Sequence, residues 1–187
     1  PAHYLIDAEG VVRHIAFGEG NYAATKTLIR ELHQDASPGV ELPKATEVAD
    51  ETPTLGSTTA ETFLGRSKDV NFAGPGAYGS GERTFTFSGS QPADSFALDG
   101  AWRVETQFAT PSGGDGRIRL AFHASQVRMV LAGEGEVRVR LDSGEMQTIQ
   151  VSGTPRSYAI VVDGTGDAQV VDVEVSPGVE AYSFTFG

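Results

Sequence analysis

Short stretches of alternating apolar and polar residues, separated by glycine-rich turns, fill the chain from Thr84 to its end. A period of two is typical of strands that bury one face, and Asp-Gly, Gly-Gly and Ser-Gly pairs are typical of the turns between them. The expected strands are Thr84–Phe87, Trp102–Phe108, Arg117–Ala124, Val127–Leu131, Glu136–Leu141, Met146–Val151, Ser157–Val162, Gln169–Val175 and Ala181–Phe186. About nine strands without a convincing helix predict a mainly β fold, a β-sandwich of jelly-roll type.

The first 34 residues follow a different pattern. The apolar runs Tyr4–Ile6 and Val11–Phe17 flank the turn Asp7–Gly10, which predicts a β-hairpin. From Asn21, a candidate N-cap, apolar residues recur at helical spacing. A β-β-α unit of this size lies below the roughly 40 residues that usually fold without help. Its apolar face is therefore expected to pack against something else.

Residues 35–60 are expected to be a linker between these two parts. Pro38, Pro43 and Pro53 interrupt regular structure, and the stretch has too little apolar periodicity for a core element. A recognition segment for a partner is the alternative interpretation. The expected organisation is thus a β-β-α part over 1–34, a linker over 35–60 and a sandwich over 61–187. No apolar run approaches the roughly 18 residues of a membrane span.

Composition excludes several classes of function. The net charge of −11 argues against a nucleic-acid partner, because binding to phosphates requires a positive field. The chain has no cysteine, so these residues hold no disulfide, thiolate metal site or thiol redox chemistry. The loop Asp163–Asp167 offers oxygen ligands for calcium, but it is too short for an EF-hand and lacks the distal glutamate. We expect neither a metal nor a cofactor.

Alternation along two strands assigns an outward stripe of basic residues. Ile118, Leu120, Phe122 and Ala124 point one way while Arg117, Arg119, Ala121 and His123 point the other, and Val137, Val139 and Leu141 oppose Arg138 and Arg140. The stripe therefore contains Arg119, His123, Arg138 and Arg140. Guanidinium groups bind carboxylates, phosphates and sugar hydroxyls, so the stripe is a candidate face for an anionic or hydroxylated ligand. The alternative is a solvated face balanced by nearby acids.

Two aromatic residues are candidate sugar platforms, because the apolar face of a pyranose stacks on a flat ring. Tyr78 lies in a glycine-rich loop and is the candidate expected to be exposed. Trp102 shares its face with Val104 and is either a core residue or a platform. For a hydrolase, the candidate groups would be Asp99, Glu105 and His123.

The first fifth of the chain resembles a known fold. Pro1, Tyr4–Asp7, Glu9–Arg13 and Gly18–Tyr22 are similar to the closing strands and helix of a thioredoxin-like domain of the TlpA type. The resemblance places Pro1 at the cis-proline position, which in that family faces an upstream Cys-x-x-Cys pair. That pair is not in this sequence, so we expect a fragment of a longer oxidoreductase. An independent hairpin and helix packed on the main domain is the alternative.

The rest of the chain resembles a second family. Glu61–Arg66, Asn71–Ala73, Leu98–Val104 and Pro177–Gly187 are similar to the C-terminal domain of DipZ-type cytochrome c biogenesis proteins. This resemblance implies a parent anchored in the cell membrane, with a membrane-embedded electron carrier followed by a thioredoxin-like domain. It also implies that the sandwich is similar to carbohydrate-binding modules and lies outside the cytoplasm.

Together these resemblances imply a noncatalytic binding module attached to a thiol-disulfide oxidoreductase of disulfide or cytochrome c maturation. Its partner would be a glycan or a cell-envelope protein, and redox partner thiols would react with the missing part of the thioredoxin-like domain. No catalytic residue and no membrane contact are expected in this chain. The alternative is a structural or dimerisation platform, which requires an apolar, arginine-poor exposed patch. A hydrolase is a third interpretation.

Overall fold

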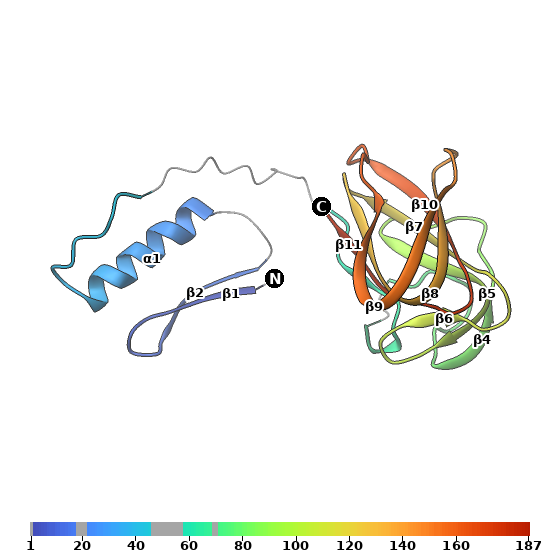
Figure 1. Ribbon diagram of the computed structural model, residues 1–187, viewed down its shortest axis with the longest axis horizontal. Coiled ribbons are helices and arrows are strands. Elements are labelled where there is room, and N and C mark those ends of the chain that lie inside the picture. The colour runs from blue at the N-terminus through green and yellow to red at the C-terminus, as the bar shows by residue number, and fades with distance from the viewer. Residues whose placement is uncertain (1, 18–21, 46–57, 69–70) are drawn as a thin grey trace. The chain divides into compact units, whose positions relative to one another are not determined.

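The computed structural model describes residues 2–17, 22–45, 58–68 and 71–187 (Figure 1). The chain divides into two compact units, Pro1–Gly56 and Ser57–Gly187, which we describe separately. The expected cis-proline position, Pro1, and the expected N-cap, Asn21, lie outside the described residues. Within the described parts, no helix has the length and hydropathy needed to cross a membrane.

The first unit contains the predicted hairpin and helix. Strands β1 (Ala2–Ile6) and β2 (Val12–Phe17) pair antiparallel, and helix α1 covers Tyr22–Ala36. The turn is held by the carboxylate of Asp7, which accepts hydrogen bonds from the backbone N–H groups of Glu9 and Val11 and pairs with Arg13. The Val11 hydrogen bond, supported by Arg13, lowers the pKa of Asp7. Local turn chemistry therefore suffices to position this hairpin.

The described residues of this first unit form no buried core. None of the residues of α1 is buried. Its large exposed apolar side chains are Tyr4, Ile6, Val11, Val12, Ile15, Tyr22, Ile29 and Val40. Helix and hairpin meet at two depressions, one lined by residues such as Leu5 and Ile29 and the other by residues such as Arg13 and Asp35. The described residues thus leave an apolar surface uncovered, as expected for a unit this small.

The second unit is all β, as predicted. Its elements are β3 (Thr62–Phe63), a 3-10 helix η1 (Arg66–Lys68), β4 (Gly81–Phe85), β5 (Ser95–Val104), β6 (Ala109–Pro111), β7 (Gly116–His123), β8 (Val127–Leu141), β9 (Gln147–Val161), β10 (Ala168–Val175) and β11 (Val179–Phe186). The nine strands form one antiparallel sheet with the order β3-β11-β6-β5-β7-β10-β8-β9, and β4 pairs with β5. Because β11 also pairs with β8, the sheet closes on itself as a sandwich-like barrel (Figure 1).

Two expected breaks between strands lie inside long continuous strands, which corrects the expected strand list. Gly133 has a φ of 90° and Gly135 a φ of 155°, yet both belong to the continuous strand β8. Before this point β8 pairs with β11, and after it β8 pairs with β10. The glycines therefore bend one strand across both layers rather than ending it. Strand β9 follows β8 over its whole length, so the expected break between Val151 and Ser157 is also absent.

Strand β5 also differs from the expected list, as do β3 and β6, which were not expected, and β4, which covers Gly81–Phe85 instead of Thr84–Phe87. Strand β5 starts at Ser95 and contains Gly100, which has a φ of 97° and had suggested a turn with Asp99. It ends at Val104, so the second half of the expected strand Trp102–Phe108 is a loop. As in β8, a glycine allows the strand to change partners, from β7 to β4 and β6.

The predicted faces of β7 and β8 are confirmed. Ile118, Leu120, Phe122, Val137 and Val139 are buried, while the arginines between them point outward. The core also contains Phe96, Trp102, Met129, Leu131 and Phe184. The described sandwich begins before the expected residue 61, since Thr59 is 3% exposed and its backbone N–H donates to the carbonyl of His123.

Candidate functional site

Four arginines gather on the outer surface of the sheet layer formed by β5, β7, β10 and β8. We call Arg117, Arg119, Arg138 and Arg140 the arginine face. Strand register alternates them with acids: Arg119 lies opposite Asp172, which lies opposite Arg140. In the next row Arg117 lies opposite Glu174, which lies opposite Arg138. The expected arginine positions are thus brought together on one face.

Most charges of the arginine face are paired within the sheet. Arg119 donates two hydrogen bonds to Asp172, at 2.7 and 3.1 Å, and this contact raises the pKa of the Arg119 guanidinium. Arg138 contacts both Glu174 and Asp115 at 2.8 Å. These carboxylates already occupy the guanidinium groups that a ligand would need. The surface resembles the balanced alternative more than an open anion site.

Arg140 differs from its neighbours. It is exposed and makes no ion pair within the described residues. It lines a small cavity of about 50 Å³ together with Phe87 and Met146. Phe87 stacks against Arg119, whose guanidinium carbon lies 4.4 Å from the ring centroid. Of the expected contacts on this face, Arg140 is therefore the one available to a ligand.

His123 lies apart from the arginine face. It is four residues along β7 from Arg119, roughly 13 Å at the rise of an extended strand. Its Nδ1 lies 2.8 Å from the carboxylate of Asp94 and 3.2 Å from the hydroxyl of Thr59. Both partners contact the same ring nitrogen, and Thr59 is buried. In a catalytic triad the nucleophile and the acid contact different nitrogens of the histidine, so these three residues do not form one. The contacts among Thr59, Asp94 and His123 instead hold the first residues of the sandwich against β7.

The candidate hydrolytic groups are not assembled. The carboxylate of Asp99 binds Arg117 at 2.7 Å, and that of Glu105 contacts Arg103 at 3.2 Å. His123 contacts neither acid. Among the described residues there is also no group of three or more His, Asp or Glu that could hold a metal ion.

Tyr78 and Trp102 are core residues, so the expectation of an exposed Tyr78 platform is wrong, and of the two alternatives for Trp102 the core one holds. Tyr78 is 7% exposed, and its hydroxyl donates to the carbonyl of Leu64 at 2.6 Å. Its ring packs with Phe72, Phe85 and Phe96, at centroid distances of 4.6, 5.7 and 5.5 Å. Trp102 is fully buried, and its indole N–H donates to the carbonyl of Asp99. Loop glycines made Tyr78 look exposed, but aromatic packing draws it inward.

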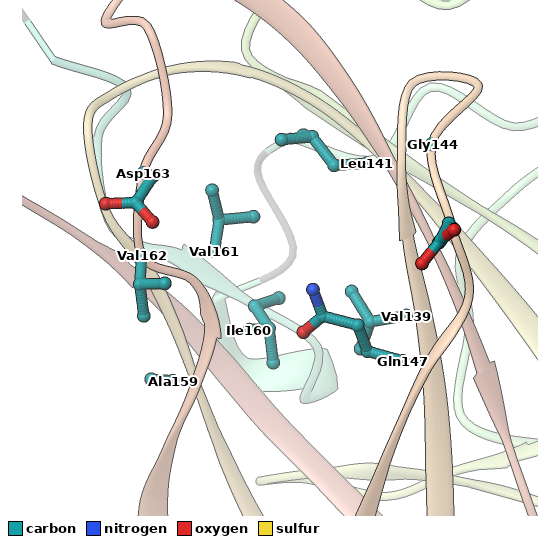
Figure 2. Close-up of a pocket in the computed structure, with 10 residues that line it drawn as sticks. Val139, Leu141, Gly144, Gln147, Ala159, Ile160, Val161, Val162 and Asp163 are labelled. Atoms are coloured by element: carbon teal, nitrogen blue, oxygen red, sulfur yellow. The ribbon is translucent and has the colours of Figure 1, made fainter.

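A second concave feature of the sandwich is a groove lined by the C-terminal end of β8 and by both ends of β9 (Figure 2). It has a volume of about 280 Å³. The lining residues are Val139, Leu141, Gly144, Glu145, Gln147, Ala159, Ile160, Val161, Val162 and Asp163. We call it the β8–β9 groove. The sequence does not predict this groove, because its lining residues come from the two ends of β9, which are separated in sequence and come together only in the fold.

The β8–β9 groove has an apolar floor and an acidic rim. Val139, Ile160 and Val161 are buried beneath it, and Figure 2 shows Asp163 and Gly144 on opposite sides of these side chains. Glu145 and Asp163 are exposed, and within the described chain neither carboxylate has a hydrogen-bond or ion-pair partner. None of the ten lining residues is basic. A concave apolar surface with a few polar groups is the usual form of a binding site.

Known proteins resemble this chain in sequence. The family described as thioredoxin-like C-terminal domain matches residues 59–187. Protein DipZ of Mycobacterium tuberculosis and protein DipZ of Mycobacterium bovis are each 43% identical to the chain over 189 residues, which cover all of this chain and 27% of each relative. A family two carbohydrate esterase from Cellvibrio japonicus aligns with 70% of this chain and 33% of its own, with a TM-score of 0.41 and 9% identity, too low to establish a common fold.

Proposed function

This chain belongs to the family of thioredoxin-like C-terminal domains and is a DipZ-type C-terminal part, and from that premise we propose that its sandwich is a noncatalytic binding domain. The domain serves a thiol-disulfide oxidoreductase that is anchored in the cell membrane and acts in disulfide or cytochrome c maturation. It holds a ligand outside the cytoplasm, next to the thioredoxin-like domain. The matched relatives are much longer than this chain, which leaves room for the redox machinery in such a parent.

The observation that carries this proposal is the β8–β9 groove. It combines a concave apolar floor with carboxylates that have no partner in the described chain. Carboxylates without partners gain most when a ligand supplies a donor or a positive charge. The candidate catalytic groups Asp99, Glu105 and His123, in contrast, each form an ion pair with a different residue and do not contact one another. A binding role therefore fits this surface better than a hydrolytic one.

The alternative, a structural or dimerisation platform, needs an apolar exposed patch. In the described sandwich the large exposed apolar side chains are Met146, which is 41% exposed, and Val162, which is 61% exposed. Two such residues fall short of the area that a stable interface buries. The apolar surface of this chain instead belongs to the first unit.

The arginine face is proposed as a secondary contact surface for a hydroxylated or anionic ligand such as a glycan. Arg140 supplies its free guanidinium, while Arg119 and Arg138 would have to share theirs with the acids that hold them. His123 is kept as a candidate through its second ring nitrogen. Burial of Tyr78 and Trp102 leaves this surface with Phe87 as its aromatic element.

A survey by NMR tests the proposal. The isotopically labelled chain is titrated separately with a neutral oligosaccharide, an amino-sugar oligomer, an acidic peptide and a basic peptide. We expect saturable shifts of backbone amides in the β8–β9 groove or on the arginine face with at least one of these probes. No saturable shift with any probe at millimolar concentration would contradict a binding role.

A further inference from the structure

We propose that the β8–β9 groove binds an extended, lysine-bearing segment of a partner protein. This inference rests on the proposed binding function and names the chemistry of its ligand. The lysine side chain would lie along the apolar floor, with its ammonium group between Glu145 and Asp163.

The shape of the groove fits this side chain. Lysine combines a four-carbon apolar stem with a charged end, and such side chains bury the stem while the charge stays in water. The floor is formed by buried Val139, Ile160 and Val161, whereas the two carboxylates lie exposed at the rim. The volume of about 280 Å³ accommodates one long side chain and part of its backbone.

The charges of the groove point to a cation. Glu145 and Asp163 have no basic neighbour among the lining residues, whereas the acids opposite the arginine face, such as Asp172 and Glu174, are paired. The groove therefore presents two carboxylates that no basic group of the described chain neutralises. A chain with a net charge of −11 also attracts a basic segment over longer distances.

The backbone beside the groove suits an extended segment. Gln147 and Ala159–Val161, which belong to β9, line it, and β9 stands at the end of the strand order. Its outer edge is therefore free of strand partners within the described residues. Edge strands can accept a further strand through backbone hydrogen bonds, which gives affinity that does not depend on side chains. Pro155 interrupts the middle of β9 but lies away from both lining stretches.

Binding of two matched peptides to the whole 187-residue chain tests the proposal by calorimetry. The first is the blocked pentapeptide Ser-Val-Lys-Val-Ser, and the second replaces lysine with norleucine, which keeps the stem and removes the charge. The test variant is Glu145→Gln/Asp163→Asn. The control variant, Glu82→Gln/Asp167→Asn, removes the same charge at two exposed residues that do not line the groove.

We expect the lysine peptide to bind the unaltered chain and the control variant equally. The test variant should bind it about five- to tenfold more weakly, the effect of losing one or two exposed ion pairs, and added salt should reduce the difference. The norleucine peptide should bind the unaltered chain and the test variant with the same weakened affinity. Circular dichroism confirms that the variants stay folded.

Equal affinity of the test and control variants for the lysine peptide would overturn the proposal, because the groove carboxylates would then play no part. Binding of an amino-sugar oligomer to the groove without binding of the peptide would overturn the protein segment as occupant while leaving a binding function intact. Failure of the broader function has a different signature, the absence of saturable binding by any probe in the NMR survey.

Discussion

Replacing Thr59 with valine should destabilise the sandwich by about 2 kcal/mol, because a buried hydrogen bond loses its acceptor. Thr59 is 3% exposed, and its hydroxyl accepts a hydrogen bond from the backbone N–H of His123 at 2.8 Å. The hydroxyl also donates to Asp94. Valine has nearly the same shape, so the packing is kept while the polar contacts are lost.

The magnitude follows from which groups are left without partners. The N–H of His123 loses the Thr59 hydroxyl, and an unsatisfied buried donor costs roughly 1–3 kcal/mol. The side chain of Asp94 is 42% exposed and keeps its contact with His123, so it adds little. For a domain of this size, a loss of about 2 kcal/mol corresponds to a decrease in Tm of roughly 6–10 °C.

Thermal unfolding followed by circular dichroism measures this change, with Thr148→Val as the matched control. Thr148 is exposed on β9, so its replacement should shift the Tm by less than about 2 °C. A shift of that small size for Thr59→Val would refute the reasoning. It would mean that water or a backbone adjustment satisfies the amide, and that Thr59 does not fasten the start of the sandwich.

Three further predictions concern the sandwich. Tyr78→Phe keeps the aromatic packing but leaves a buried carbonyl without its donor, so urea unfolding should show a loss of about 1–2 kcal/mol. Gly133→Ala should cost more than about 3 kcal/mol, because φ is 90° and the added Cβ would lie 2.1 Å from the carbonyl oxygen of Gly178; near-unchanged stability would contradict the bend described for β8. Burial and the carboxylate of Glu180 raise the pKa of Tyr182 to about 12, so its stabilising effect should be complete below about pH 10 and lost as the pH rises through 12. Absorbance titration should show a late tyrosine signal that is lost in Tyr182→Phe, and an identical titration curve for that variant would contradict this.

The sequence was sufficient to predict features that depend on local patterns. Alternation correctly assigned buried Ile118 and outward Arg119, because a strand with one buried face permits no other arrangement without exposing its apolar side chains. The first hairpin could also be predicted, since the side chain of Asp7 itself accepts the hydrogen bonds that hold the turn. The all-β class followed from the same signals.

Features that depend on distant contacts could not be predicted. Gly133 resembles a turn residue, but its role as a bend inside β8 depends on pairing with β11 and β10. Tyr78 was expected to be exposed because its loop is rich in glycine, whereas in the fold Phe72, Phe85 and Phe96 cover its ring. The β8–β9 groove joins Glu145 and Asp163 across a whole strand. The sequence did show that Glu145 and Asp163 each lie in a turn after an apolar strand, but it did not show that the two turns lie on one groove.

The most direct measurement is the rate of thiol-disulfide exchange by a full-length protein of this family, compared with a version lacking residues 58–187. The protein is first reduced, and its dithiol is then oxidised by one of two disulfide substrates, which is itself reduced to thiols: hydroxyethyl disulfide, or the lysine pentapeptide extended by a Cys-Gly-Gly-Cys disulfide. We expect the deletion to leave the second-order rate constant with hydroxyethyl disulfide unchanged and to lower that with the peptide. A loss of rate with hydroxyethyl disulfide, or unchanged rates with both substrates, would contradict a noncatalytic binding domain.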